Sequence, residues 1–262
     1  MVADVGYVPM RVNESAGPGA AGLRSLSARS AVLSMLLAVH PPQLPVKDLV
    51  RLVEPFGVGG STLRAALSRM VAAGDLWRTD AVYGLSDRLL ARQRRQDDAI
   101  HPGTRAWHGD WEMVVITATG RGPAERAELR SRLTALRLAE LREGVWLRPA
   151  NLERRLPDGL REVAGAYTAR PDEPAQDLVA RLWPLDGWAA TARALLAHAA
   201  AAPGPAERLT AFAAIVRHLL GDPVLPPALL PTDWPGPALR TAYAEYRREV
   251  AAAAGWRDRG EA

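Results

Sequence analysis

Three helix-like stretches followed by two strand-like stretches, all within residues 27–85, constrain the fold of this chain more than any other feature. Apolar residues recur at helical spacing after Ser27, whose hydroxyl is placed to cap the first helix, and Pro41 ends that helix. Pro45 can open a second helix at its first turn. The run at 56–60 is rich in glycine, so it predicts the turn before a third helix.

The third helix is predicted to begin with Ser61 as its cap and to end near Ala73, before Gly74. Two short stretches that favour β-structure follow at 76–79 and 82–85, separated by two residues as in a hairpin. The order helix, helix, turn, helix, hairpin predicts a winged helix-turn-helix.

The rest of the chain predicts a small α+β unit followed by helices. A further helix is expected over 87–100, before the unit begins. Within the unit we expect a strand at 111–117, a helix at 123–142, strands at 145–149 and 163–168, and a helix at 175–182. This order favours a ferredoxin-like domain. From Leu185 onward the pattern is helical, apart from a proline-rich insert at 222–237.

The predicted fold class is therefore α+β and mostly α, with an N-terminal winged helix-turn-helix, a central ferredoxin-like domain and a C-terminal helical domain. The expected domain limits are a disordered arm at 1–23, a winged helix at 24–101, a ferredoxin-like domain at 107–184 and a helical domain at 185–256.

Positive charge is concentrated in the N-terminal region. The chain has 33 Lys and Arg against 29 Asp and Glu, a net charge of +4. Residues 24–101 hold eleven basic and seven acidic side chains, so their excess of four accounts for the whole net charge. Positive potential attracts a polyanion by releasing its condensed counterions, so we expect nucleic acid to bind here. The alternative is a charged face that only contacts water.

The third helix is the predicted reading element. Its apolar residues Leu63, Leu67, Met70 and Val71 share one face and should pack into the core. Small residues and arginines share the opposite face, which suits the major groove because guanidinium groups can bridge guanine O6 and N7. The residues expected to contact DNA are Ser61, Thr62, Arg64, Ala65, Ser68 and Arg69 on the helix, and Arg78, Thr79 and Tyr83 on the hairpin.

Several classes of protein are disfavoured by the sequence. Cysteine is absent, which excludes disulfides, thiolate metal sites and cysteine nucleophiles. No signal peptide or membrane span is expected, because the most apolar later stretch, 189–202, is shorter than the roughly 20 residues that cross a bilayer. We expect a cytoplasmic protein without membrane contact.

No catalytic site is predicted either. The histidines form no metalloprotease pair, and no nucleophile elbow or phosphate-binding loop occurs, so we expect no enzyme, no cofactor and no metal. Asp110, just before the expected strand at 111–117, keeps a metal-dependent nuclease as an alternative by fold analogy. Such a site usually gathers several carboxylates, and no second one can be placed from the sequence.

Motifs along most of the chain carry a family resemblance. They lie at 61–77 (STLRAALSRMVAAGDLW), at Trp107 and 111–116, at 144–146, and at 219–236 (LLGDPVLPPALLPTDWPG). Together they resemble the PaaX family of bacterial repressors, which control phenylacetate and related aromatic-acid catabolism. The resemblance extends over roughly residues 24–250. It implies a homodimeric repressor of double-stranded operator DNA that is released by a small effector, such as the aryl-CoA thioester phenylacetyl-CoA.

An aryl-CoA effector needs an apolar slot for its acyl group and cations for its phosphates. Tryptophans and basic residues of the central and C-terminal regions offer this chemistry, although tryptophans more often serve packing. The candidates are Trp146, Arg148, Trp183, Trp188, Arg217, His218 and Trp234. The alternative to a ligand-controlled repressor is a constitutive DNA-binding or assembly protein.

The segment Asp222–Gly236 is stiffened by five prolines, so it can hold an irregular path rigidly. We expect Leu225, Leu229 and Trp234 among the residues that it directs into neighbouring helices. One interpretation is a structural clasp that closes the C-terminal domain. The other is a transmitter that passes ligand occupancy to the dimer.

Overall fold

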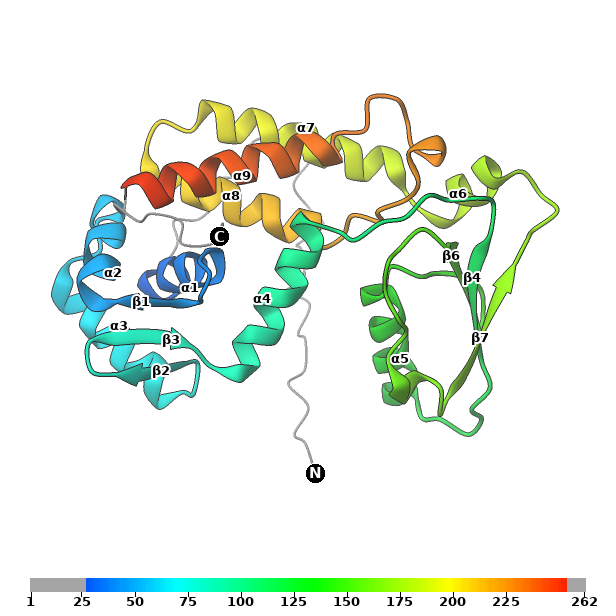
Figure 1. The fold of residues 1–262 in the computed structure, drawn as a ribbon, viewed down its shortest axis with the longest axis horizontal. Helices are drawn as coiled ribbons and strands as arrows, with labels where there is room; N and C mark the ends of the chain where they lie inside the picture. Colours follow the sequence, from blue (N-terminus) through cyan, green and yellow to red (C-terminus); the bar gives the residue numbers. More distant parts are fainter. Residues whose placement is uncertain (1–26, 254–262) are drawn as a thin grey trace.

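A computed structural model of the chain describes residues 27–253, so the arm expected at 1–23 lies outside the described residues. Figure 1 shows two lobes. The helical lobe comprises residues 27–101 and 185–253, and the sheet lobe comprises residues 104–182.

The first part of the helical lobe contains the expected helices and hairpin in the expected order. Its strands form an antiparallel sheet in the order β1-β3-β2. The short strand β1 was not expected from the sequence, and pairing with β3 defines it. The elements are α1 Ala28–Ala38, β1 Gln43–Pro45, α2 Val46–Val53, the 3₁₀ helix η1 Glu54–Phe56, α3 Gly60–Ala72, β2 Leu76–Thr79, β3 Val82–Leu85 and α4 Asp87–Ile100.

The start of α3 differs from the expectation that Ser61 caps it. Gly57, at φ +70°, turns the chain out of η1, and Gly59 takes the extended backbone of the cap position without a side-chain cap. Ser61 therefore lies within the first turn. By contrast, Ser27 caps α1 as predicted, because its Oγ accepts a hydrogen bond from the Ser30 amide at 3.2 Å.

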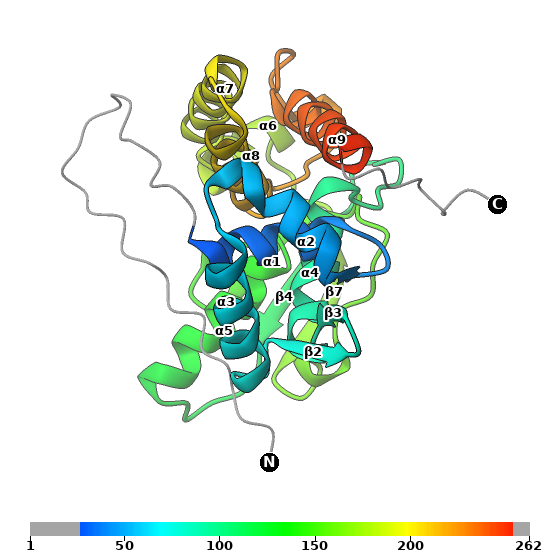
Figure 2. The same ribbon diagram turned by 90° about the vertical axis from the view of Figure 1, so that its left-hand side faces the viewer.

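The C-terminal helices complete the core of this region. Leu209 of α8 is buried in the same apolar cluster as Leu36, Leu49 and Leu67, and Tyr246 of α9 packs against it. α8 is Pro205–Leu219, and α9 is Gly236–Ala253. The helical lobe is thus built from both ends of the described chain, with α8 and α9 beside the N-terminal helices in Figures 1 and 2.

Helix α4 connects the hairpin to the C-terminal helices through two buried glutamines. The Gln93 side chain donates to the carbonyls of Leu37 and Val39, at 3.3 and 2.9 Å, at the end of α1. One turn further on, Gln96 donates to the Tyr243 hydroxyl of α9 at 3.3 Å. These bonds satisfy polar groups that would be costly to bury alone, and they fix α4 to both neighbours.

The sheet lobe holds four antiparallel strands in the order β5-β6-β4-β7. Its core lies between the sheet and α5, around Val114, Leu129, Leu133 and Trp146. The elements are β4 Trp111–Ile116, α5 Pro123–Ala135, β5 Ala139–Arg142, β6 Val145–Pro149, the 3₁₀ helix η2 Asp158–Leu160, β7 Ala164–Ala169 and α6 Ala175–Leu182.

The helix predicted over 123–142 was wrong over its last seven residues. α5 ends at Ala135, and Arg137 takes a left-handed backbone at φ +60° that reverses the chain. Residues 139–142 then pair with β6 as strand β5. Pairing along a sheet edge thus prevails over the helical propensity of these residues, and Leu141 stays exposed.

The C-terminal region is helical with an irregular insert, as expected. α7 is Leu185–Ala201, and the 3₁₀ helix η3 is Pro227–Leu229, within the insert. Leu225 and Leu229 are buried against Trp111 and Leu147 as well as α6, so the insert packs on the sheet lobe and not only on neighbouring helices. In Figure 1 this segment passes from the helical lobe toward α6 and returns into α9.

Candidate functional site

The outer face of α3 presents the side chains that the sequence predicted for DNA contact. Leu63, Leu67 and Met70 are buried, as expected, and Val71 is half-buried. Within residues 27–253, neither Arg64 nor Arg69 has an ion-pair partner. The exposed set is Ser61, Thr62, Arg64, Ala65, Ser68 and Arg69.

The three hairpin residues that were expected to contact DNA differ in their exposure to solvent. Arg78 and Thr79 are exposed, whereas Tyr83 is only 8% exposed. Arg78 lies opposite Tyr83 in the strand register and its guanidinium carbon lies 5.7 Å from the ring centroid, while its Nε donates to the Asp80 carbonyl at 2.8 Å. Tyr83 is therefore a packing residue beneath Arg78, and not part of the outer surface.

Exposed Trp77 lies opposite Gly84 in the hairpin. A Cβ on Gly84 would stand 2.2 Å from the Trp77 ring, so only glycine leaves room for the indole there. Figure 2 shows α3 and β2 at the same edge of the helical lobe. Helix α3 and the hairpin thus lie next to each other on the same side of this lobe.

A buried carboxylate anchors the end of α3. Asp75 is 2% exposed and follows the turn at Gly74. Arg29 of α1 donates to it at 2.7 Å, and Arg88 of α4 forms a second ion pair with it. The two arginines, each about half exposed, tie α1 and α4 to the end of the exposed helix.

Three of the residues expected to bind an effector form one aromatic stack. The Trp188 ring lies 4.3 Å from the His218 ring and 4.5 Å from the Trp234 ring, centroid to centroid, with nearly parallel planes. His218 Nε2 donates to the Trp188 carbonyl at 3.0 Å. Burial lowers the pKa of His218, against the opposing effects of this bond and of Asp222, so the surroundings favour the neutral form of the ring.

The other four expected effector residues do not join this stack. Trp146 is buried in the core of the sheet lobe, and Trp183 packs near Trp111. Arg148 is fully buried, and Arg217 is exposed at the end of α8. The structure therefore brings together two of the four tryptophans and His218, and places the two arginines elsewhere.

Arg148 holds backbone groups and has no acidic partner within salt-bridge distance among the described residues. Its guanidinium donates to the carbonyls of Arg137 and Val224, at 3.3 and 3.2 Å, and to Asn151 Oδ1 at 2.9 Å. Burial, reinforced by the nearby Arg154, lowers the pKa of Arg148 to about 9. Both carbonyls belong to residues with positive φ, +60° at Arg137 and +49° at Val224.

A second polar cluster continues from Val224 toward α4. The Val224 amide donates to Asp222 at 2.9 Å, and Asp222 is 1% exposed. Arg240 of α9 binds Asp222 at 2.7 Å and also donates to the carbonyl of Ala99 at 3.1 Å, in the last turn of α4. Direct hydrogen bonds thus connect the sheet lobe, the proline-rich insert, α9 and α4.

The sequence did not predict a basic groove between the lobes. Arg92 and Arg95 of α4 lie along it together with Arg217 of α8. The spacing of Arg92 and Arg95 places both on one face of a helix, and that signal was present in the sequence. Arg217 lies far along the chain, so only the packing of α8 beside α4 brings the three together.

The described residues contain neither a cluster suited to a metal ion nor a membrane-spanning helix. No three His, Asp or Glu side chains within 27–253 gather in a way that could hold a metal ion. Asp110, the candidate carboxylate for a nuclease, pairs with Arg170 at 2.5 Å, and the hydrogen bond from Arg170 lowers its pKa. None of the helices described here is long and apolar enough to cross a membrane.

Comparison with known families divides the chain into three matched parts. Residues 27–89 match the family described as PaaX-like protein, residues 104–169 match the PaaX protein central Cas2-like domain, and residues 178–256 match the PaaX-like protein C-terminal domain. The first part lies in the helical lobe, the second lies in the sheet lobe, and the third begins within α6 and contains the C-terminal helices. The molecule thus has the build of a PaaX-like regulator.

A solved structure extends the similarity over nearly the whole chain. It is the uncharacterized protein Rv0674 from Mycobacterium tuberculosis, 48% identical, covering 88% of this chain and 98% of its own, with a TM-score of 0.79. A search of curated proteins found no match. The chain belongs to the PaaX family.

Proposed function

We propose that the protein is a sequence-specific DNA-binding transcriptional repressor that reads an operator with α3. The observation that carries this proposal is the exposed face of α3, where Arg64 and Arg69 stand among small side chains beside an exposed hairpin. Small side chains allow close approach to a groove, and unpaired guanidinium groups can bind base edges or phosphates. In this proposal the exposed Arg78 and Thr79 contact the DNA backbone or the minor groove.

The domain assignments form part of the proposal. Residues 27–101, the described part of the range expected at 24–101, act as a winged helix-turn-helix, supported by the order of α1, α2, α3 and the hairpin. Residues 107–184 form a ferredoxin-like domain, supported by the helix between the first two strands and by the order of the sheet. The domain differs from the ferredoxin-like order in the position of its second helix. Only η2 lies between β6 and β7, and α6 follows β7. Residues 185–253 form the helical domain, and its expected limit at 256 lies outside the described residues.

The proposed repressor is a cytoplasmic homodimer without catalytic activity. One recognition helix reads only a few base pairs, and paired half-sites supply the remaining specificity. A small effector, such as an aryl-CoA thioester, releases the dimer from DNA. The stack of Trp188, His218 and Trp234 and the groove arginines offer the aromatic and cationic surfaces that such a ligand needs.

Selection from a pool of random duplexes tests this function. The wild-type protein should enrich an inverted repeat, and light scattering of the complex should give two chains per duplex. Replacing Arg64 or Arg69 by alanine should weaken binding to the enriched duplex by about 1–3 kcal/mol. Arg142→Ala, which removes an exposed arginine from the sheet lobe, is the matched control and should bind normally.

Three outcomes separate the alternatives. Failure to enrich any sequence would overturn the proposal, as would wild-type affinity in a folded Arg64/Arg69 double variant. Enrichment without release by phenylacetyl-CoA or other acyl-CoA thioesters would leave a constitutive DNA-binding protein instead of a ligand-controlled repressor.

A further inference from the structure

The two lobes have separate apolar cores. Within the described chain, no buried cluster joins residues 104–182 to residues 27–101, to α8 or to α9. The sheet lobe instead shares a cluster with the proline-rich insert, through Leu225 and Leu229. Because this part of the insert is packed on the sheet lobe, the relative position of the lobes depends on how the insert is held by the helices.

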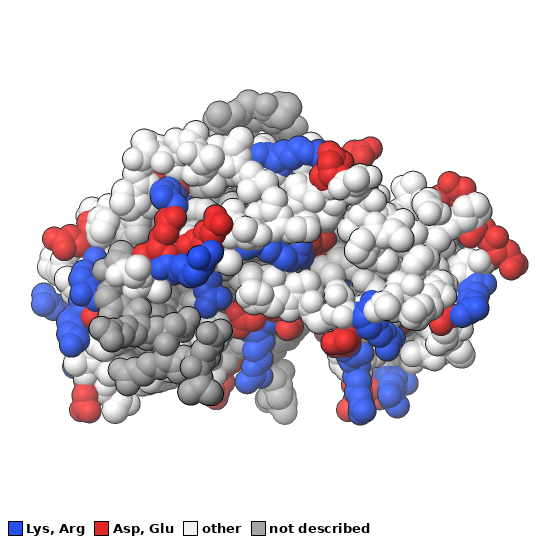
Figure 3. Space-filling view, turned by 45° about the horizontal axis from the view of Figure 1, so that its top comes forward, with Lys and Arg blue, Asp and Glu red and all other residues white. Residues whose placement is uncertain are grey.

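Charge does not hold the lobes together in a general way. None of the ion pairs between described residues joins residues 104–182 to residues 27–101 or 185–253. On the face drawn in Figure 3, Lys and Arg occur in separate groups with Asp and Glu among them. Attraction between exposed groups of mixed sign is weak and is screened by salt. The angle between the lobes therefore depends on specific contacts.

The polar contacts between the lobes converge on one carbonyl oxygen. Among residues 27–253, each hydrogen bond from residues 104–182 to residues 185–253 ends on the Val224 carbonyl, which accepts from Arg148 at 3.2 Å and from Asn151 at 3.0 Å. The Val224 amide donates to Asp222 Oδ1 at 2.9 Å. Val224 is thus bonded to the sheet lobe through its oxygen and to the other end of the contact through its nitrogen.

Val224 holds this position in an unfavourable backbone conformation. Its φ is +49°, in the left-handed region that β-branched residues rarely adopt. Outliers of this kind persist only where their surroundings fix them, and they cluster at functional positions. The hydrogen bonds on both sides of Val224 provide that constraint, so the conformation points to a role beyond packing.

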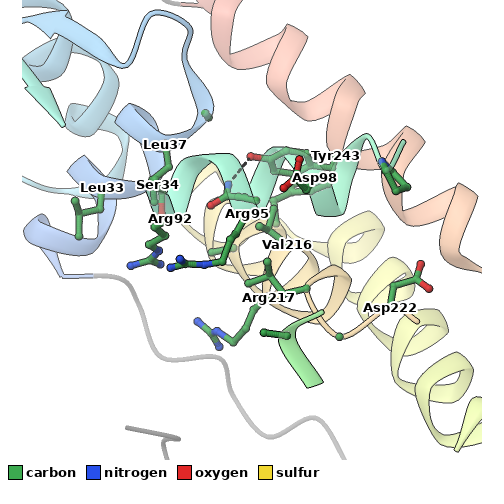
Figure 4. Close-up of a pocket in the computed structure, with 18 of the residues that line it drawn as sticks. Leu33, Ser34, Leu37, Arg92, Arg95, Asp98, Val216, Arg217, Asp222 and Tyr243 are labelled. Carbon is green, nitrogen blue, oxygen red and sulfur yellow. Dashed lines mark hydrogen bonds between the residues drawn. The ribbon is translucent and has the colours of Figure 1, made fainter. Parts of the chain in front are cut away.

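Asp222 and Arg240 continue the contact from Val224 to α4. Arg240 Nη2 donates to Asp222 Oδ2 at 2.7 Å, and Arg240 Nε donates to the Ala99 carbonyl at 3.1 Å. The ion pair is enclosed, because the two side chains are 1% and 18% exposed. Figure 4 shows Asp222 well apart from Arg92 and Arg217, so this ion pair is separate from the arginines of the groove. Asp222, Val224 and Arg240 form a joint between the lobes.

We propose that Asp222 and Arg240 are positioning residues that set the angle between the lobes and, through it, the spacing of the half-sites that the dimer reads. Each chain carries one α3 helix, so the spacing of two half-sites follows from the separation of two such helices. A dimer joined through its sheet lobes carries the angle within each chain into that separation. The spacing rests on the proposed function, whereas the angle between the lobes does not.

Distances between nitroxide spin labels test the angle on the full chain without DNA. The chain has no cysteine, so Arg94→Cys in α4 and Arg142→Cys in β5 place one label on each lobe, at exposed positions. Dilution with unlabelled protein keeps the measured distance within one chain. The labelled chain should give one narrow distance distribution.

Two substitutions of Arg240 should broaden this distribution to different extents. Arg240→Met keeps the apolar stem but loses both hydrogen bonds, so we expect a distribution about twice as wide. Arg240→Lys keeps the charge but cannot reproduce the fixed geometry of the two bonds, so its width should fall between the two. The matched control is Arg193→Met, which removes an exposed ion pair between α7 and Asp233 of the same insert and should leave the width unchanged.

The joint is overturned if a folded Arg240→Met or Arg240→Lys variant keeps the narrow distribution. Equal broadening by Arg193→Met overturns it as well, because any contact of the insert would then have the same effect. Circular dichroism establishes that each variant is folded, and the lysine variant decides the matter if the methionine variant does not fold.

Selection from random duplexes tests the consequence for DNA. The wild-type protein should enrich its half-sites at one spacing, and Arg240→Met should enrich the same half-site at several spacings, because α3 itself is unchanged. A single spacing in Arg240→Met overturns the effect on DNA, and so does loss of the half-site sequence, which would assign Arg240 to the support of α3. Failure of the wild type to enrich any sequence overturns the proposed function, while the label distances still decide on the joint.

Discussion

Asp75 in the helical lobe and Arg148 in the sheet lobe are both almost fully enclosed, but their surroundings balance the charge in different ways. Asp75 is paired with two arginines whose side chains are 57% and 46% exposed. Arg148 is bound by backbone carbonyls and by the Asn151 amide oxygen. The charge of Asp75 is neutralised by two arginines that contact water. The charge of Arg148 is stabilised by the dipoles of carbonyl and amide groups in the interior.

The difference shows what each charge organises. The arginines around Asp75 belong to α1 and α4, so this cluster fixes the position of whole helices. The groups around Arg148 include two residues with positive φ, conformations that cost free energy for residues other than glycine. Arg148 thus stabilises the local backbone where β5 begins and where the proline-rich insert contacts the sheet lobe.

Replacing Arg148 should have the largest effect on stability. Arg148→Met keeps the apolar stem but leaves the carbonyls of Arg137 and Val224 without their donor, so we expect the free energy of unfolding to fall by about 3 kcal/mol. Urea unfolding measures this loss. Arg142→Met, at an exposed arginine on the neighbouring strand, should change stability by less than about 0.5 kcal/mol. Equal stability of Arg148→Met and wild type would refute the role given to this cation.

Replacing Asp75 should cost less, because the arginines that it leaves behind can be hydrated. Asp75→Asn keeps the size of the side chain and removes its charge, and we expect a loss of about 1–2 kcal/mol in the same urea experiment. The loss should shrink as salt is added, because the partners of Asp75 contact solvent. The corresponding loss at Arg148 should not depend on salt. If both losses responded to salt alike, the contrast between the two clusters would be wrong.

His218 gives the smallest effect and extends the comparison to a half-buried group whose charged form is disfavoured. Its pKa is lowered in the folded protein, so below the ordinary value of about 6.5 the unfolded chain takes up a proton more readily than the folded one. Stability should therefore be complete above that pH and decline as the pH falls through the folded pKa. Urea unfolding at pH 7.5 and 5.5 measures the slope, which His218→Gln should reduce. His198→Gln, at an exposed histidine on α7, should leave the slope unchanged.

Local patterns were sufficient to predict the helices of the N-terminal region and the exposed face of α3. A 3.6-residue period assigns each side chain of an amphipathic helix to core or solvent, and Leu63 and Arg64 follow it. The hairpin was located correctly as well. Tyr83 was misplaced because a partner across the strand, Arg78, covers it, and strand register cannot be read from so short a stretch.

Features that depend on distant residues were not predictable in the same way. The end of α5 depends on pairing between β5 and β6, and the aromatic stack joins Trp188 to residues on two other segments. The sequence identified Trp188, His218 and Trp234 by their chemistry but could not separate them from Trp146, which is a core residue. Arg217 lies near Arg92 only because the chain folds so that α8 packs beside α4, and no pattern in the sequence indicated this.

The two glutamines of α4 have a geometric consequence for reading DNA. α4 has 14 residues, which span about 21 Å at 1.5 Å per residue. Because Gln93 and Gln96 bind α1 and α9 within a single turn, a small rotation of α9 turns α4 about a point in its second half. Because that point lies about 11 Å from the start of α4, a tilt of about 10° moves the end next to the hairpin by roughly 2 Å. An adjustment among the C-terminal helices no larger than a side-chain movement would thus reach the hairpin that we propose contacts DNA.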